Sequence, residues 1–226
     1  MLLVASATAC RTVAPPPAEP GPLAGLAAAD LDSQRLYRVE ARGPEGRSTL
    51  RLVLRLWRPD RFQATASDAL GRALWSLEVA GDRARWRDPR SGESCSLSAD
   101  EPLALPRFSL PLASRELPAV LLGRLPAAAA GAAAVGAGAV GGEWRDPQGR
   151  RGTFAARDGQ LVEWRLADGG VEVARWRRDD AGVELRLDGG RIALVWREAA
   201  RERLRSPPPP WRERDDEPEC ADAPLS

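Results

Sequence analysis

Hydrophobic and polar residues alternate along much of the chain, as in β-strands with one buried face. The clearest alternation is a set of four leucines spaced two residues apart: Leu50, Leu52, Leu54 and Leu56. The residues between them fall on the opposite face, which we predict to be wet: Arg51, Val53, Arg55 and Trp57. The leucine face needs an apolar cover, which is either a packed core or a lipid.

The same alternation, interrupted by turn residues, predicts about eleven short strands. They lie near residues 35–43, 48–58, 61–67, 72–80, 83–88, 94–98, 152–157, 160–167, 171–178, 183–188 and 191–198. The pairs Asp158-Gly159, Asp168-Gly169 and Asp188-Gly189 are typical of tight hairpins. Consecutive hairpins predict one curved antiparallel sheet whose concave side needs a lid or a ligand.

Two segments have the spacing of amphipathic helices. The first covers residues 22–33. The second begins near Ser114, a residue type that caps helix N-termini, and ends near Gly123 and Pro126. Its apolar residues share one face: Leu117, Val120 and Leu121. Both helices are expected to lie over the sheet.

The two ends of the chain differ in composition from the middle. Residues 1–10 are apolar and end in Ala7-Thr8-Ala9-Cys10, which looks like a bacterial lipoprotein signal with Cys10 as the lipidation site. The alternative is a disordered N-terminus with a chance cysteine. Residues 11–22 are proline-rich and predict a tether, and residues 201–226 predict a proline-rich disordered tail. Between them, residues 127–142 form an Ala/Gly-rich stretch that predicts a loop.

The amino-acid composition excludes several kinds of functional site. At 226 residues the chain is one domain with tails, and all 33 of its basic residues are arginine. A net charge of +1 with interspersed charges shows no basic stripe for nucleic acid. Histidine is absent, so a Ser-His-Asp or Cys-His site cannot form within the chain, and a metal site is not expected. We expect no cofactor and no enzymatic activity.

Three cysteines occur in the sequence, at positions 10, 95 and 220. In an oxidising compartment such as the periplasm, Cys95 could form a disulfide with Cys220. The sequence leaves free thiols open as the alternative.

Several short segments occur in the order found in the LolB and LolB-like outer-membrane lipoproteins, which the chain resembles over roughly residues 23–126. They are Tyr37-Arg38-Val39-Glu40-Ala41-Arg42, Gly46-Arg47, Arg58-Pro59-Asp60-Arg61-Phe62, Ala69-Leu70-Gly71-Arg72 and Leu121-Leu122-Gly123-Arg124-Leu125-Pro126. The resemblance implies a mainly β fold over residues 23–200, an incomplete antiparallel half-barrel with a helical lid above a hydrophobic cavity. It also implies a monomer, lipid-anchored to the inner leaflet of the outer membrane on its periplasmic face. Such a protein takes lipoproteins from a soluble LolA-type carrier and delivers them to that membrane.

The resemblance also suggests site residues. Leu70 lies in the turn where family members carry an exposed apolar residue that engages the membrane, although an inward-facing leucine is the alternative. The acyl chains are expected to contact eight residues, each of which could instead be simple core: Leu50, Leu52, Leu54, Leu56, Trp75, Leu77, Leu121 and Trp196. Two other functions stay open. One is a structural or interaction lipoprotein with a filled β core, and the other is a hydrolase with paired carboxylates, although no pair stands out.

Overall fold

The computed structural model describes residues 26, 28–44, 46–105, 108–124, 140–145, 149–157, 160–180, 182–210, 218 and 220. Within these residues the structure is mainly β. Its strands are β1 (Ser33–Gly43), β2 (Gly46–Trp57), β3 (Arg61–Ser67), β4 (Ala73–Ala80), β5 (Arg83–Asp88), β6 (Glu93–Ser98), β7 (Pro102–Leu105), β8 (Phe108–Ala113), β9 (Val140–Arg145), β10 (Arg151–Arg157), β11 (Gln160–Asp168), β12 (Val171–Asp179), β13 (Gly182–Leu187) and β14 (Ile192–Arg203). The helical elements are η1 (Ser114–Glu116), α1 (Leu117–Leu122) and η2 (Asp188–Gly190).

Twelve strands form one antiparallel sheet in the order β6-β5-β4-β3-β2-β1-β14-β13-β12-β11-β10-β9. Strands β1 to β6 are one meander and β9 to β14 are another. The two meanders meet where β1 pairs with β14, from Ser33 opposite Arg203 to Arg42 opposite Ala193. The strands at the two ends of this order, β6 and β9, do not pair with each other, so the barrel is unclosed.

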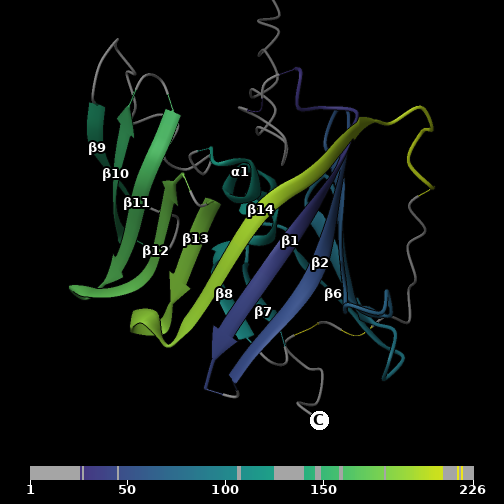
Figure 1. Ribbon diagram of the computed structural model, residues 1–226, viewed down its shortest axis with the longest axis horizontal. Helices are drawn as coiled ribbons and strands as arrows, with labels where there is room; N and C mark the ends of the chain where they lie inside the picture. The colour runs from purple at the N-terminus through teal and green to yellow at the C-terminus, as the bar shows by residue number, and fades with distance from the viewer. Residues whose placement is uncertain are drawn as a thin grey trace, which may run out of the picture.

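The sheet curves around α1 and the β7-β8 hairpin, which lie between its two wings (Figure 1). The predicted incomplete antiparallel half-barrel with a helical lid is therefore confirmed. The second predicted helix is also confirmed, because η1 begins at Ser114 and Gly123 ends α1 in the left-handed conformation. The predicted capping role of Ser114 is wrong, because the N-cap residues of η1 and α1 are Ala113 and Glu116. The sequence missed three strands: β7, β8 and β9, the last of which begins inside the predicted Ala/Gly loop. Residues 127–139 of that loop lie outside the described residues.

One hydrophobic core joins both wings to α1. The largest side chains with almost no exposure come from both meanders and from the helix: Trp164, Trp176, Phe62, Leu54, Leu56, Leu77, Leu166, Leu187, Val79 and Val120. Alternation along the strands places these side chains on the concave face. No helix in the described part of the chain is long and apolar enough to span a membrane.

The first predicted helix is wrong where the structure describes it. Residues 28–30 form a turn, and β1 already begins at Ser33. Asp32 adopts a φ of 51°, which a right-handed helix excludes. The Ser33 hydroxyl donates to the Asp30 carbonyl at 2.5 Å and holds this turn. Residues 22–25 and 27 lie outside the described residues.

The predicted wet face of β2 is partly covered by the C-terminal segment. Trp57 is only 6% exposed, and its indole N–H donates to the Ser206 carbonyl at 3.2 Å. Strand β14 extends to Arg203, beyond the predicted domain boundary at residue 200. Further along, the Ser96 amide of β6 donates to the Pro218 carbonyl at 2.9 Å. The segment after residue 200 therefore contacts the sheet in at least two places.

Candidate functional site

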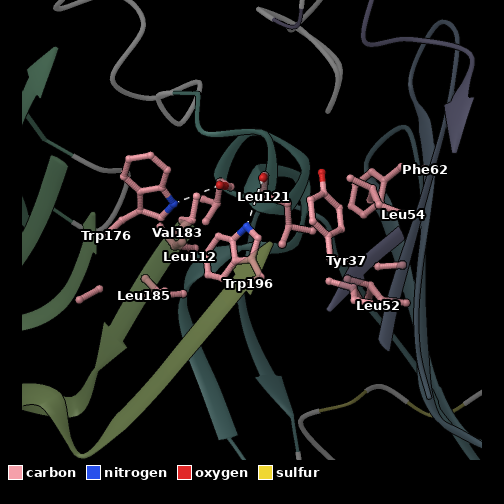
Figure 2. Close-up of a cluster of buried hydrophobic side chains, with 14 of the residues drawn as sticks. Tyr37, Leu52, Leu54, Phe62, Leu112, Leu121, Trp176, Val183, Leu185 and Trp196 are labelled. Carbon is pink, nitrogen blue, oxygen red and sulfur yellow. Dashed lines mark hydrogen bonds between the residues drawn. The ribbon is translucent and has the colours of Figure 1, made fainter. Parts of the chain in front are cut away.

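The C-terminal end of α1 is held by polar groups from the sheet (Figure 2). The Trp176 indole N–H on β12 donates to the Val120 carbonyl at 3.1 Å, and the Trp196 indole on β14 donates to the Leu121 carbonyl at 3.3 Å. Carbonyls in the last turn of a helix have no partner within the helix. The Trp196 indole supplies a hydrogen bond to the Leu121 carbonyl, and the Trp176 indole adds a second one to the Val120 carbonyl, which already accepts from the Gly123 amide at 3.1 Å. The two indoles fix the lid on the concave face.

Arg178, also on β12, completes this arrangement. Its Nη2 donates to the Leu122 carbonyl at 3.3 Å, and its guanidinium lies 5.6 Å from the centre of the Trp176 ring. Gly123 makes room for it, because a Cβ at that position would lie 1.9 Å from the same Nη2. The left-handed φ of 68° at Gly123 also favours glycine. The contact between Arg178 and the end of α1 therefore requires glycine at position 123.

Beside this helix end lies a pocket of about 300 Å³ between α1 and strands β1, β12, β13 and β14. Its apolar wall consists of Leu121, Leu122, Val183 and Trp196. Its polar wall includes Arg35, Tyr37 and Arg178. The remaining lining residues are Asp179, Asp180, Gly182, Arg197 and Glu198. Seven of these twelve lining residues are polar or charged, a larger polar share than in the usual small-molecule site, whose lining is mainly apolar.

The two arginines of the polar wall have different partners. Arg35 is neutralised, because its guanidinium lies 2.5 Å from a carboxylate oxygen of Asp30 and 2.6 Å from one of Glu198. Within the described residues, Arg178 bonds a neutral carbonyl and an aromatic ring instead of a carboxylate. Burial, and next the positive charge of Arg124, lower the pKa of Arg178 from its ordinary value. An arginine nevertheless stays protonated at neutral pH. The positive charge of Arg178 is therefore retained, and no described carboxylate forms an ion pair with it.

Tyr37 adds a second polar group to this wall. It is the one tyrosine of the sequence, and its side chain is only 2% exposed. Its hydroxyl makes no hydrogen bond of normal geometry among the described residues, although the positive charge of Arg35 acts on it. Burial raises the pKa of this hydroxyl far above its usual range, so the group is a neutral donor. A buried hydroxyl without a partner costs free energy that a bound acceptor would recover.

The predicted cavity residues are divided between the pocket and the core. Leu121 and Trp196 line the pocket. The other six lie in or against the core that continues from it: Leu50, Leu52, Leu54, Leu56, Trp75 and Leu77. Leu50 and Trp75 are only partly buried, whereas the other four are fully buried. Contact of these residues with acyl chains stays a prediction.

Leu70 projects from the turn between β3 and β4 with 79% of its surface exposed, so the inward-facing alternative is wrong. The Asp68 carboxylate fixes this turn by accepting from the Leu70 amide at 2.9 Å and the Arg72 amide at 3.0 Å. It also accepts from Nε of Arg72 at 2.6 Å. Burial would raise the pKa of Asp68, but these hydrogen bonds together hold it below the ordinary value. The turn therefore presents Leu70 on an ordered backbone.

A disulfide joins Cys95 of β6 to Cys220, with the two Cα atoms 4.8 Å apart. The bond ties the C-terminal segment to the edge of the sheet. Cys10 lies outside the described residues, as do residues 1–25 as a whole. Among the described residues, no group of three or more His, Cys, Asp or Glu side chains is arranged to hold a metal ion.

Sequence reasoning missed the polar wall of the pocket, although the strand alternation contained the signal. Arg178 follows Ala174 and Trp176 in steps of two, so the same alternation places it on the concave face. Arg35 is likewise in phase with Tyr37 on β1. An arginine in phase with buried residues indicates either a buried ion pair or a polar site. Arg35 is the first case and Arg178 is the second.

Comparison with known proteins supports the fold. No protein-family model matches the chain, and no curated protein matches it. Among solved structures, a LolA superfamily protein from Nitrosomonas europaea is similar, with a TM-score of 0.53 and 10% identity, covering 79% of this chain and 88% of that one. A domain named as an outer membrane lipoprotein-sorting protein from Vibrio parahaemolyticus gives a TM-score of 0.49 and 8% identity, with 79% and 88% covered. The first likeness shows the fold alone: the chain shares an unclosed, helix-covered β architecture with that structure.

Proposed function

We propose that the chain is a LolB-like, lipid-anchored protein of the periplasmic face of the outer membrane that binds acyl chains and delivers lipoproteins or other lipids to that membrane. In this proposal Cys10 carries the lipid anchor and a LolA-type periplasmic carrier supplies the cargo. The observation that supports it best is the unclosed sheet whose apolar concave face is covered by the short helix α1 and the β7-β8 hairpin, with a pocket open at the end of α1.

The energetics of acyl transfer suit this arrangement. Each methylene gains roughly 0.8 kcal/mol on leaving water, so a long acyl chain crosses an aqueous gap only inside a protein. Exchange between two similar apolar sites is nearly balanced, and a modest difference in affinity then gives it direction. Entry of a full acyl chain requires α1 to move away from the core, because the described interior is filled by side chains. The eight predicted cavity residues would then become contacts for the chain.

Membrane contact is assigned to the exposed apolar turn at one end of the sheet. Leu70 and Val171 are the large hydrophobic residues with high exposure among the described residues, at 79% and 67%. Leu70 lies in the β3-β4 turn and Val171 is the first residue of β12, and the antiparallel order of the strands places both at the same end of the sheet. Both side chains can enter the same bilayer surface, each adding up to about 2 kcal/mol of apolar burial.

A structural or interaction lipoprotein with a filled core is the second candidate. The observation in its favour is the packing itself, since Leu54, Leu56 and Leu77 have no exposed surface at all. In that case the pocket beside α1 would be a surface feature without cargo, and the protein would bind no lipid.

Native mass spectrometry of the protein purified from a bacterial periplasm separates the two candidates. Bound acyl species, together with uptake of a fluorescent fatty acid, are expected for a carrier. Leu122→Trp should fill the pocket and abolish uptake, whereas Leu117→Trp, at the other end of α1 and away from the pocket lining, should retain it. A well-folded protein that neither holds acyl species nor takes up the fluorescent fatty acid would exclude the carrier function.

A further inference from the structure

We propose that the pocket beside α1 recognises an anionic head group on a single acyl chain, with Arg178 and the Tyr37 hydroxyl as the groups that bind the anion. This inference rests on the proposed acyl-binding function and adds a preference for charge. The ligand class is a single-chain anionic amphiphile, with a carboxylate or a phosphate as its head.

The residues that line the pocket carry balanced charge, with three arginines and three carboxylates, so the support for an anion is local and comes from Arg178. Arg35 already lies against the carboxylates of Asp30 and Glu198. Arg178 donates one hydrogen bond, to the Leu122 carbonyl, among the described residues, and a guanidinium carries five N–H donors. An incoming carboxylate or phosphate can therefore be bound without breaking an existing ion pair. Charge-assisted bonds of this kind are the stronger class of protein hydrogen bond.

Tyr37 points to the same ligand independently of charge. Its hydroxyl is buried, makes no hydrogen bond of normal geometry among the described residues, and belongs to the lining of this pocket. Because the hydroxyl is neutral, it can donate to an anionic oxygen. Tyr37 on β1 and Arg178 on β12 thus offer donors to one pocket from two strands.

The apolar wall and the volume indicate the rest of the ligand. Leu121, Leu122, Val183 and Trp196 form a surface for an alkyl chain next to the two donors. A volume of about 300 Å³ is at the lower end of ligand pockets, which span roughly 300–1,000 Å³. The pocket in this conformation therefore fits part of one chain and its head group rather than several chains together.

Isothermal titration calorimetry with four probes tests the assignment. Octanoate and octyl phosphate share a chain with octanol but add a charge, and acetate carries the carboxylate without the chain. Octanoate or octyl phosphate should bind at least about tenfold tighter than octanol, as expected for hydrogen bonds to a charged group. The better of the two identifies the head group as carboxylate or phosphate. Acetate should bind far more weakly than octanoate.

Two variants and a control assign the effect to residues. Arg178→Gln should remove the preference for the charged probes, whereas Arg177→Gln should keep it. Arg177 is the next residue on β12, is exposed, and lies opposite Glu163 and Glu184 on the outer face. Tyr37→Phe should weaken octanoate binding severalfold while leaving the melting temperature unchanged or higher, because the hydroxyl it removes makes no hydrogen bond of normal geometry among the described residues. This second variant keeps the test decisive if Arg178→Gln unfolds.

Each result separates the inference from the proposed function. Equal binding of octanol and octanoate would overturn the anion preference and leave an acyl-binding protein. Equal binding of acetate and octanoate would overturn both, because the chain would then contribute nothing. Binding of no probe would also overturn both. A charge preference that survives in Arg178→Gln and Tyr37→Phe would overturn the assignment to these residues.

Discussion

Replacement of Gly123 by alanine tests how α1 is fixed to the sheet. Gly123 has a φ of 68° and ends the helix. The new Cβ would lie 1.9 Å from Nη2 and 2.6 Å from Cζ of Arg178, distances that no pair of non-bonded atoms tolerates. The guanidinium must therefore move, and its hydrogen bond to the Leu122 carbonyl is then lost.

Two costs add in this variant. A non-glycine residue in the left-handed region costs about 1–2 kcal/mol. Loss of a hydrogen bond from a charged donor costs about 1.5–3 kcal/mol. Gly169→Ala is the matched control, since Gly169 also has a left-handed φ, of 54°, but nothing lies within 4 Å of its Cβ position. We expect Gly123→Ala to lose about 2 kcal/mol more unfolding free energy than Gly169→Ala.

Urea unfolding followed by tryptophan fluorescence measures both variants against the parent protein. For a chain of this size, about 2 kcal/mol corresponds to a difference of roughly 4–8 °C in melting temperature. Unfolding free energies of the two variants that agree within about 0.5 kcal/mol would refute the contact between Gly123 and Arg178 as a determinant of stability.

Three further outcomes are expected. Leu54→Ala should lower the unfolding free energy by about 2–5 kcal/mol because Leu54 is fully buried, whereas Leu70→Ala should change it by less than about 0.5 kcal/mol. Equal effects of the two variants in denaturant titrations would contradict the core assignment of Leu54. Joint replacement of Cys95 and Cys220 by serine should lower the melting temperature, because the disulfide closes a loop with a separation of 125 residues worth at most about 5 kcal/mol, and calorimetry showing no change would contradict this role. The pKa of Asp68 is lowered in the folded protein, so the stabilisation that its carboxylate gives the turn is complete above the ordinary pKa of 3.8 and is lost as the pH falls through the lower pKa of the folded state. Amide exchange at Leu70 that accelerates already between pH 7 and 5 would be inconsistent with this.

Strand alternation predicted most of the sheet because its signal is local. Eleven predicted strand positions coincide with strands of the twelve-stranded sheet, and the leucine set of β2 faces the core as expected. The helix from Ser114 was predictable for the same reason, since its apolar face and the glycine that ends it lie within ten residues, although Ser114 does not cap it. The hairpin β7-β8 was missed because the sequence around it, 102–113, has three prolines, which argue against a strand even where apolar residues alternate.

Features that depend on distant segments were not predictable from local patterns. The burial of Trp57 requires Ser206, about 150 positions later, to cover the outer face of β2. The turn at residues 28–30 overrides the helical pattern because Asp30 is bound by Ser33, Arg35 and Arg124. The pocket requires Tyr37, Leu121 and Arg178 to meet, and they lie on three separate elements.

The pairing of β1 with β14 at the centre of the sheet has a consequence for the order of folding. Ser33 lies opposite Arg203, so the central seam joins nearly the two ends of the described domain. Each meander can form from neighbouring strands, but the seam requires closure of a very long loop, which is slow. During synthesis the sheet therefore stays in two halves until its last strand is made. The concave face, with its pocket and its lid, comes into existence only at that final step.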